Sequence, residues 1–139
     1  MATILLDTNV ILDIWDRDPV WHAGSSQQMR KLSHIYELAI NPIVYAELAP
    51  RFTDPATLNE KLADLGIVFE NIPRDAAFFA GKAHLYYRSR GGAKSSVLAD
   101  FFIGAHALAL GCPVLTRDTR RYSTYFPEVR LIAPDPRLC

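Results

Sequence analysis

The sequence predicts an α/β fold in which a mostly parallel sheet of four to five strands is covered by helices on both faces. Short apolar segments alternate with longer helical segments along the chain, as expected for strands joined by crossover helices. Half of the 139 residues are hydrophobic, which is enough for a sizeable core. We therefore expect one domain over residues 1–139.

The N-terminal half contains three predicted strands, at about residues 3–6, 36–40 and 67–69. Helices are expected at about residues 10–15, 21–32, 42–49 and 57–65. Asn41 and Pro42 mark the start of the third helix, because Asn caps a first turn well and Pro is tolerated at the first position. This helix should end before Pro50. Gly66 is typical of the residue that follows a helix.

The C-terminal half continues the alternation. Apolar residues at a helical period predict a long helix at about residues 75–87, followed by a glycine-containing loop at 90–93. Ser95 or Ser96 should begin a helix that runs to about residue 110. Strands are expected at 114–116 and 129–132, with a short helical turn at 120–125 between them.

Four acidic residues lie where this fold would bring them together. Asp7 and Asp118 each follow a predicted strand, whereas Glu47 and Asp100 lie on helices among apolar neighbours. Ligands of open α/β sheets bind at the carboxyl ends of the strands. Carboxylates gathered there repel one another, and a hard divalent cation relieves the repulsion. The four positions therefore predict a site for Mg²⁺ or Mn²⁺.

Each acid also has an ordinary structural explanation when it is taken singly. Asp7 can be a helix cap, Glu47 a solvated helix residue, and Asp118 a turn residue. Asp100 is harder to explain in this way, because apolar residues surround it. Taken together, the four positions favour a site. The residues expected to orient ligands or waters around it are Thr8, Asn9 and Thr116.

Basic and aromatic residues alternate near the predicted site, a pattern that suits single-stranded RNA. Arginine contacts phosphate and tyrosine stacks on bases. The residues expected to bind substrate are Asn9, Arg90, Lys94 and Arg117. Further basic and aromatic residues in the same segments are Arg88, Arg120, Arg121, Tyr86, Tyr87, Tyr122 and Tyr125. A solvated charged surface explains the individual residues equally well.

Four segments together resemble the motifs of PIN-domain ribonucleases: Leu5-Leu6-Asp7-Thr8-Asn9-Val10, Tyr45-Ala46-Glu47-Leu48, Leu98-Ala99-Asp100-Phe101-Phe102-Ile103-Gly104-Ala105-His106-Ala107, and Leu115-Thr116-Arg117-Asp118. The likeness spans about residues 3–132 in order and spacing. The small size resembles the VapC toxins of bacterial toxin–antitoxin pairs.

This resemblance implies a PIN-like three-layer fold and an endoribonuclease that depends on Mg²⁺ or Mn²⁺. It also implies a homodimer and a small antitoxin that inhibits the enzyme, and it assigns the catalytic positions to Asp7, Glu47, Asp100, Asp118 and Thr116. Many relatives carry a further acid where this sequence has Arg121, which puts a second metal site in doubt. An antitoxin that presents Arg or Lys to the acids would compete with the metal.

Two other functional classes stay open. One is a receiver-type phosphoacceptor domain, which would need a second acid beside Asp7 and a lysine after a late strand. The sequence has Thr8-Asn9 and Arg117 at these places. The other class is a non-catalytic RNA-binding module of the same fold, against which the four acids argue.

Composition limits the possible binding partners and the cellular location. The formal net charge is zero, so RNA binding must come from a local basic patch. No apolar run is long enough for a membrane span. Two cysteines that form no metal or redox motif, and an N-terminus without a leader pattern, predict a cytoplasmic protein. The large aromatic residues Trp15, Trp21, Phe52 and Tyr86 exceed what a small core readily hides, which also favours a dimer.

Overall fold

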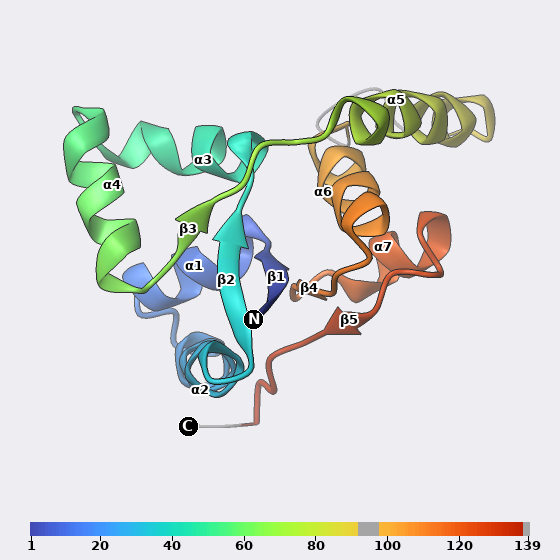
Figure 1. Ribbon diagram of the computed structural model, residues 1–139. Coiled ribbons are helices and arrows are strands. Elements are labelled where there is room, and N and C mark those ends of the chain that lie inside the picture. The colour runs from blue at the N-terminus through green and yellow to red at the C-terminus, as the bar shows by residue number, and fades with distance from the viewer. Residues whose placement is uncertain (92–97, 138–139) are drawn as a thin grey trace.

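The computed structural model describes residues 1–91 and 98–137, and it contains a five-stranded sheet in which every pairing is parallel (Figure 1). The strand order is β3-β2-β1-β4-β5. The strands are β1 (Ala2–Leu6), β2 (Tyr36–Ile40), β3 (Val68–Phe69), β4 (Val114–Leu115) and β5 (Leu131–Ile132).

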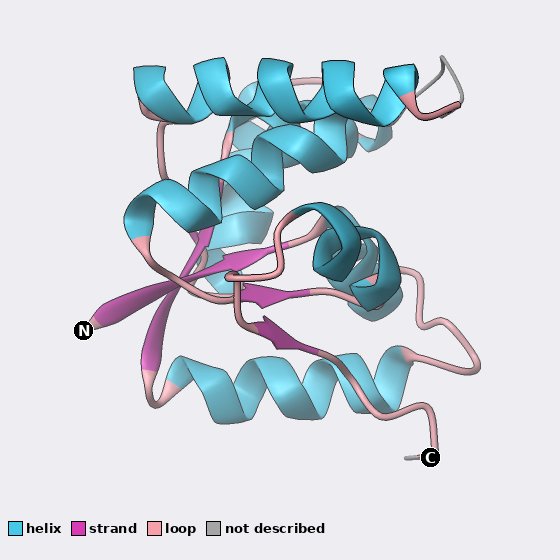
Figure 2. Cartoon of the chain, turned by 90° about the vertical axis from the view of Figure 1, so that its right-hand side faces the viewer, coloured by secondary structure: helices cyan, strands magenta, loops and turns pink. Residues whose placement is uncertain are grey.

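Helices cover both faces of this sheet, which gives three layers and confirms the predicted fold class. Figure 2 shows α2 against one face, with α6 and then α5 on the opposite side. The helices are α1 (Thr8–Trp15), α2 (His22–Ser33), α3 (Pro42–Leu48), α4 (Pro55–Asp64), α5 (Arg74–Ser89), α6 (Leu98–Leu110) and α7 (Thr119–Tyr125), with a 3-10 turn, η1, at Ala49–Arg51. Within the described ranges, no helix is long and apolar enough to cross a membrane.

Strand β1 lies in the middle of the sheet. Leu5 pairs with Ala39 of β2 on one side and with Val114 of β4 on the other. The chain builds outward from β1 to β3, then returns to the other side of β1 for β4 and β5. The order of the strands therefore reverses between β1 and β4, and a reversal of this kind is where α/β sheets bind their ligands.

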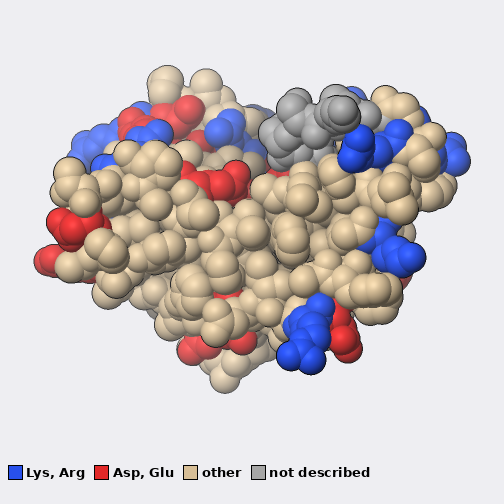
Figure 3. Space-filling model, turned by 90° about the horizontal axis from the view of Figure 1, so that it is seen from above, with Lys and Arg blue, Asp and Glu red and all other residues tan. Residues whose placement is uncertain are grey.

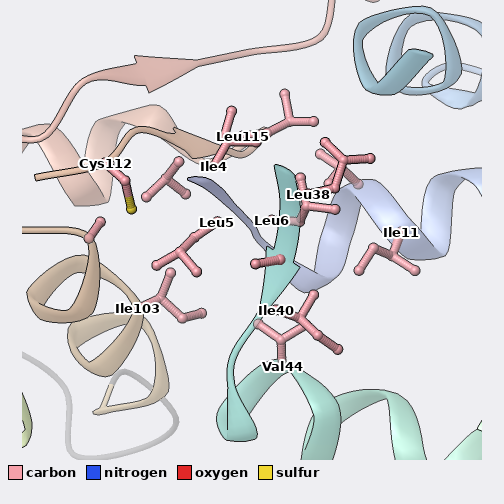
Figure 4. Packing of buried hydrophobic residues seen from close by; sticks show 14 of the residues in the cluster. Ile4, Leu5, Leu6, Ile11, Leu38, Ile40, Val44, Ile103, Cys112 and Leu115 are labelled. Carbon is pink, nitrogen blue, oxygen red and sulfur yellow. The ribbon is translucent and has the colours of Figure 1, made fainter. Parts of the chain in front are cut away.

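The core forms around β1, whose residues Ile4, Leu5 and Leu6 are at most 1% exposed. Side chains of a strand alternate between the two faces, so these residues contact both helical layers. Helices α1, α3 and α6 contribute Ile11, Val44 and Ile103 to the same cluster (Figure 4).

The predicted helix signals agree with the structure. The side chain of Asn41 accepts hydrogen bonds from the backbone N–H groups of Ile43 and Val44, at 3.0 and 3.1 Å. Gly66 follows α4 with a φ of +71°, a conformation that favours glycine. The proposed caps at Ser95 and Ser96 lie outside the described residues.

Several predicted boundaries differ from the structure by one or two residues. The last strand is shorter than residues 129–132, because the N–H of Val129 donates to the carbonyl of Phe126 in a turn, at 3.0 Å. Helix α3 ends at Leu48, before Pro50 as predicted, and the chain continues into η1, which contains Pro50. Proline is tolerated there because it lies in the first turn, where an N–H has no helical partner.

Candidate active site

Asp7 lies at the carboxyl end of β1, directly before α1, and its side chain is buried. One oxygen, Oδ1, accepts a hydrogen bond from the N–H of Thr8 at 2.8 Å. The other, Oδ2, accepts hydrogen bonds from the hydroxyls of Thr116, at 2.7 Å, and Tyr122, at 3.2 Å. The residue that follows β4, Thr116, is thus hydrogen-bonded to the residue that follows β1, Asp7.

Burial makes the charged form of Asp7 costly. The pKa of Asp7 rises from 3.8 to about 6, mainly because the carboxylate is removed from water. The hydrogen bond from Thr116 opposes this rise, and the negative charge of Asp100 adds to it. A positive charge near Asp7 would relieve both causes.

Asp100 and Asp118 lie together beside the side chain of Arg121. Nη1 of Arg121 pairs with Oδ2 of Asp100 and lies 3.6 Å from Oδ2 of Asp118. Burial raises the pKa of Asp100, the nearby Asp118 also raises it, and Arg121 lowers it. The carboxylate of Asp100 therefore lies close enough to those of Asp7 and Asp118 for their negative charges to interact.

Glu47 is reached through Thr8. The hydroxyl of Thr8, in the first turn of α1, donates to Oε1 of Glu47 on α3 at 2.6 Å. Thr116 is a further connection, because its hydroxyl also accepts the N–H of Asp118 at 2.9 Å. The structure therefore links all four predicted acids in one network: Thr8 connects Asp7 to Glu47, Thr116 connects Asp7 to Asp118, and Arg121 connects Asp118 to Asp100.

The predicted substrate-binding residues occupy different settings. Asn9 is held within the network: its Nδ2 donates to Asp7 at 3.4 Å and its Oδ1 accepts the N–H of Arg117 at 3.2 Å. The guanidinium of Arg117 pairs with the buried Asp13 at 3.0 Å. Arg90 is exposed at the end of α5 and donates to the hydroxyl of Tyr86 at 3.1 Å, whereas Lys94 lies outside the described residues.

The surface seen from above, the direction in which β2 ends, carries acidic side chains near its middle and basic side chains on both sides of them (Figure 3). A ligand with several negative charges would meet basic groups at the edges and an acidic centre that needs a cation. This distribution is compatible with a phosphodiester and a metal together.

Comparison with protein families finds a match between residues 4–127 and the PIN domain. The chain belongs to the PIN domain family. A search of curated proteins found no significant match. The family assignment replaces the receiver-type alternative.

Solved PIN-fold structures cover nearly the whole chain. The VapBC2 complex from Rickettsia felis, bound to a promoter DNA fragment, has a TM-score of 0.70 at 19% identity, over 96% of this chain and 99% of that one. FitAcB from Neisseria gonorrhoeae has a TM-score of 0.64 at 24% identity, over 96% of this chain and 98% of that one. VapC20 from Mycobacterium tuberculosis, a toxin that cleaves the sarcin-ricin loop, has a TM-score of 0.58 at 17% identity, over 92% of this chain and 99% of that one. At these identities the likeness shows the fold.

The donor chemistry of this PIN domain fits a hard divalent cation, because its convergent groups are carboxylate oxygens with a buried hydroxyl beside them. As they are placed, no three acidic, histidine or cysteine side chains within the described residues form a group that could hold a metal ion. Other side chains of the protein already contact several of these carboxylate oxygens. Arg121 already pairs with Asp100 and Asp118, and Glu47 faces the hydroxyl of Thr8.

Three features of the site were absent from the predicted set. Tyr122 was expected to face RNA, but it is buried and donates to Asp7. Its position four residues after Asp118, on the inward face of a short amphipathic helix, was an available signal. The Arg121 pairs, and the contact of Asp13 with Arg117, join distant parts of the chain and leave no periodic pattern.

A pH-dependent stability difference should isolate the cost of burying Asp7. The folded state holds the proton of Asp7 more tightly than the unfolded chain, so this group lowers the free energy of unfolding as pH rises from about 4 to about 6. A shift of this size corresponds to about 3 kcal/mol. In chelator, the stability of the wild type relative to Asp7→Asn should fall by about that amount between pH 4 and 7.

Urea unfolding of both proteins across this range measures the difference. Asp75→Asn is the matched control, because Asp75 is exposed in the first turn of α5. A wild-type stability that keeps a constant offset from Asp7→Asn would contradict the raised pKa.

Proposed function

We propose that this PIN domain is an endoribonuclease that requires Mg²⁺ or Mn²⁺ and acts as the toxin of a toxin–antitoxin pair. One observation carries the proposal: a buried carboxylate, Asp7, shares a network with three further acids at the point where the strand order reverses. Burying and crowding negative charge without a cation is unfavourable, so the network needs a positive ion for its function.

The chain's own residues have distinct roles in this proposal. Asp7, Glu47, Asp100 and Asp118 hold the ion, and the hydroxyl of Thr116 fixes the orientation of Asp7 through its 2.7 Å hydrogen bond. A bound divalent ion supplies a Lewis acid next to the scissile phosphate. The buried Tyr122 donates to the same Asp7 oxygen as Thr116 and so keeps that side chain from rotating.

RNA would bind across the basic residues beside the acids. Asn9, Arg90, Lys94 and Arg117 remain the proposed contacts. The structure gives Arg117 a second role, because its guanidinium lies over the ring of Trp21 at 5.0 Å and pairs with Asp13. We therefore expect Arg117 to shape the loop between Thr116 and Asp118, and Arg90 to be the more available phosphate ligand.

The proposed protein partner is a small antitoxin. Support comes from structural neighbours whose complexes contain a toxin together with an antitoxin, one of them from Klebsiella pneumoniae. An antitoxin segment that presents Arg or Lys would find the acidic network an attractive target. Competition between this segment and Mg²⁺ follows from their shared charge.

Metal-dependent cleavage of RNA tests the proposed activity. Purified protein should cut a structured RNA with Mg²⁺ or Mn²⁺, lose this activity in excess EDTA, and regain it when the metal is restored. Cleavage that continues in EDTA would contradict the metal mechanism. RNA binding without cleavage in any divalent ion would favour the non-catalytic alternative.

We also propose a homodimer, with its interface on α5, which carries Tyr86 of the aromatic residues expected from sequence, rather than on Trp15, Trp21 or Phe52. Trp15 and Phe52 pack edge to face, 5.5 Å between ring centres, and Arg117 covers Trp21. Helix α5 instead exposes Phe78, Phe79, Leu85 and Tyr86, each more than 50% accessible, at the periphery of the fold (Figure 1). Exposed apolar patches of this kind mark interfaces.

Light scattering should give a dimer mass for the wild type and a monomer mass for Leu85→Glu, since a charge in an apolar interface is costly. The matched control is Lys61→Glu, which introduces the same residue at an exposed position on α4, away from the apolar patch of α5. A wild-type monomer at tens of micromolar would refute the dimer.

A further inference from the structure

Arg121 places a positive charge against two of the four acids of the candidate site. A single nitrogen, Nη1, serves both Asp100 and Asp118, and its pairing with Asp100 joins residues 21 positions apart in the sequence. The carboxylate partners come from two different elements, the first turn of α6 and the residue directly before α7. The guanidinium therefore lies between two of the four proposed metal ligands.

The contacts that hold Arg121 are reversible. Its side chain is 43% exposed, and that of Asp118 is 41% exposed, so water can replace either partner. The side chain of Arg117, by contrast, is held in place. Its guanidinium is pinned between the ring of Trp21 and Asp13, whose side chain is 2% exposed.

A divalent ion and this guanidinium cannot share the same carboxylates. Both need the oxygens of Asp100 and Asp118, and their positive charges repel each other strongly at such short range. A metal ion that binds must first separate Arg121 from its partners. The apparent affinity is then lower than the intrinsic affinity by the fraction of molecules in which Arg121 has already moved away.

We propose that Arg121 is a built-in competitor of the divalent cation at Asp100 and Asp118, and that this residue sets the metal affinity of the site. The inference rests on the proposed metal-dependent function. In the structure, Arg121 already occupies carboxylate oxygens that a cation at this site would need. Arg121 is thus the residue that decides how much free metal the protein needs.

Titration calorimetry with MnCl₂ alone tests this competition without any measurement of activity. At fixed ionic strength, Arg121→Gln should bind Mn²⁺ about tenfold more tightly than the wild type, because it keeps a polar side chain of similar length but removes the competing charge. Arg121→Lys should stay within about threefold of the wild type, since it retains a positive charge. If the glutamine variant folds poorly, the lysine variant still compares how an ammonium group and a guanidinium group compete with the metal ion for these carboxylates.

Arg120→Gln is the matched control. Arg120 lies next to Arg121 on α7 and its side chain is exposed, so the substitution removes the same net charge outside the ion pairs. It should change the Mn²⁺ affinity by less than about twofold. Equal tightening by Arg120→Gln and Arg121→Gln would overturn the proposal, because the effect would then be general electrostatics.

Two further results separate this inference from the proposed function. If Arg121→Gln binds Mn²⁺ no more tightly than the wild type while Asp100→Asn abolishes binding, the metal site stands and Arg121 is not its competitor. If neither the wild type nor Arg121→Gln binds Mn²⁺, both the competitor and the metal site are refuted, since removing Arg121 should have opened the ligands.

Discussion

Asp100→Asn should reduce RNA cleavage by about three orders of magnitude and leave the fold intact. The substitution preserves the shape of the side chain but removes a charge that we propose binds the metal. Charge stabilisation by a metal ion contributes several kcal/mol to a transition state, and each 1.36 kcal/mol is a tenfold change in rate. Asp100 lies in the first turn of α6 with its side chain 20% exposed, so the amide can be accommodated.

Single-turnover cleavage of a labelled RNA measures this loss, and circular dichroism checks the fold. The matched control is Asp75→Asn, the same change in the first turn of another helix, α5. The control should cleave at the wild-type rate. Full activity of Asp100→Asn would contradict the assignment of Asp100 to the metal site.

Asp13→Ala should destabilise the protein by about 3 kcal/mol, the largest stability effect that we expect from a polar residue. Asp13 is buried on α1, where Oδ2 accepts the hydroxyl of Ser25 at 2.8 Å and Oδ1 pairs with Arg117 at 3.0 Å. Removing one partner of a buried pair leaves the other without compensation, typically at a cost of about 3–5 kcal/mol. Arg117 is 32% exposed, so we expect the lower end of this range.

Chemical unfolding compares Asp13→Ala with Asp16→Ala. Asp16 pairs with Arg51 at 2.5 Å, but both side chains are more than 40% exposed. An exposed pair contributes at most about 1 kcal/mol, so the control should lose little stability. Equal losses in the two variants would show that burial of Asp13 is not the cause.

The same substitution should also weaken cleavage, because Arg117 lies between Thr116 and Asp118. Its backbone N–H donates to Asn9 at 3.2 Å, so loss of its side-chain anchor would loosen the loop that positions Asp118. This connection gives Asp13 a role in the site although it binds neither metal nor RNA in our proposal.

The fold was predictable because it depends on local and periodic signals. Apolar strands, the cap at Asn41 and the turn at Gly66 each act within a few residues, and the structure contains them. The positions of Asp7 and Asp118 at strand ends followed from the general rule that parallel strands end on one edge.

Contacts between distant side chains were not predictable in the same way. A tyrosine on a short helix can face water or the core, and the burial of Tyr122 depends on how α7 packs against α6 and β5. The pairing of Arg121 with Asp100 depends on the same packing. Trp15, Trp21 and Phe52 are only partly buried, because two of these rings cover each other and the third lies under Arg117, and these ring contacts could not be read from the sequence.

Anomalous scattering from crystals grown with MnCl₂ would show whether the four acids bind a divalent ion, because it locates the ion without reference to activity. We expect a manganese peak in contact with carboxylate oxygens of Asp7 and Asp100, and a side chain of Arg121 that no longer pairs with Asp100. A manganese-free acidic network in crystals of a protein that still cleaves RNA would contradict it.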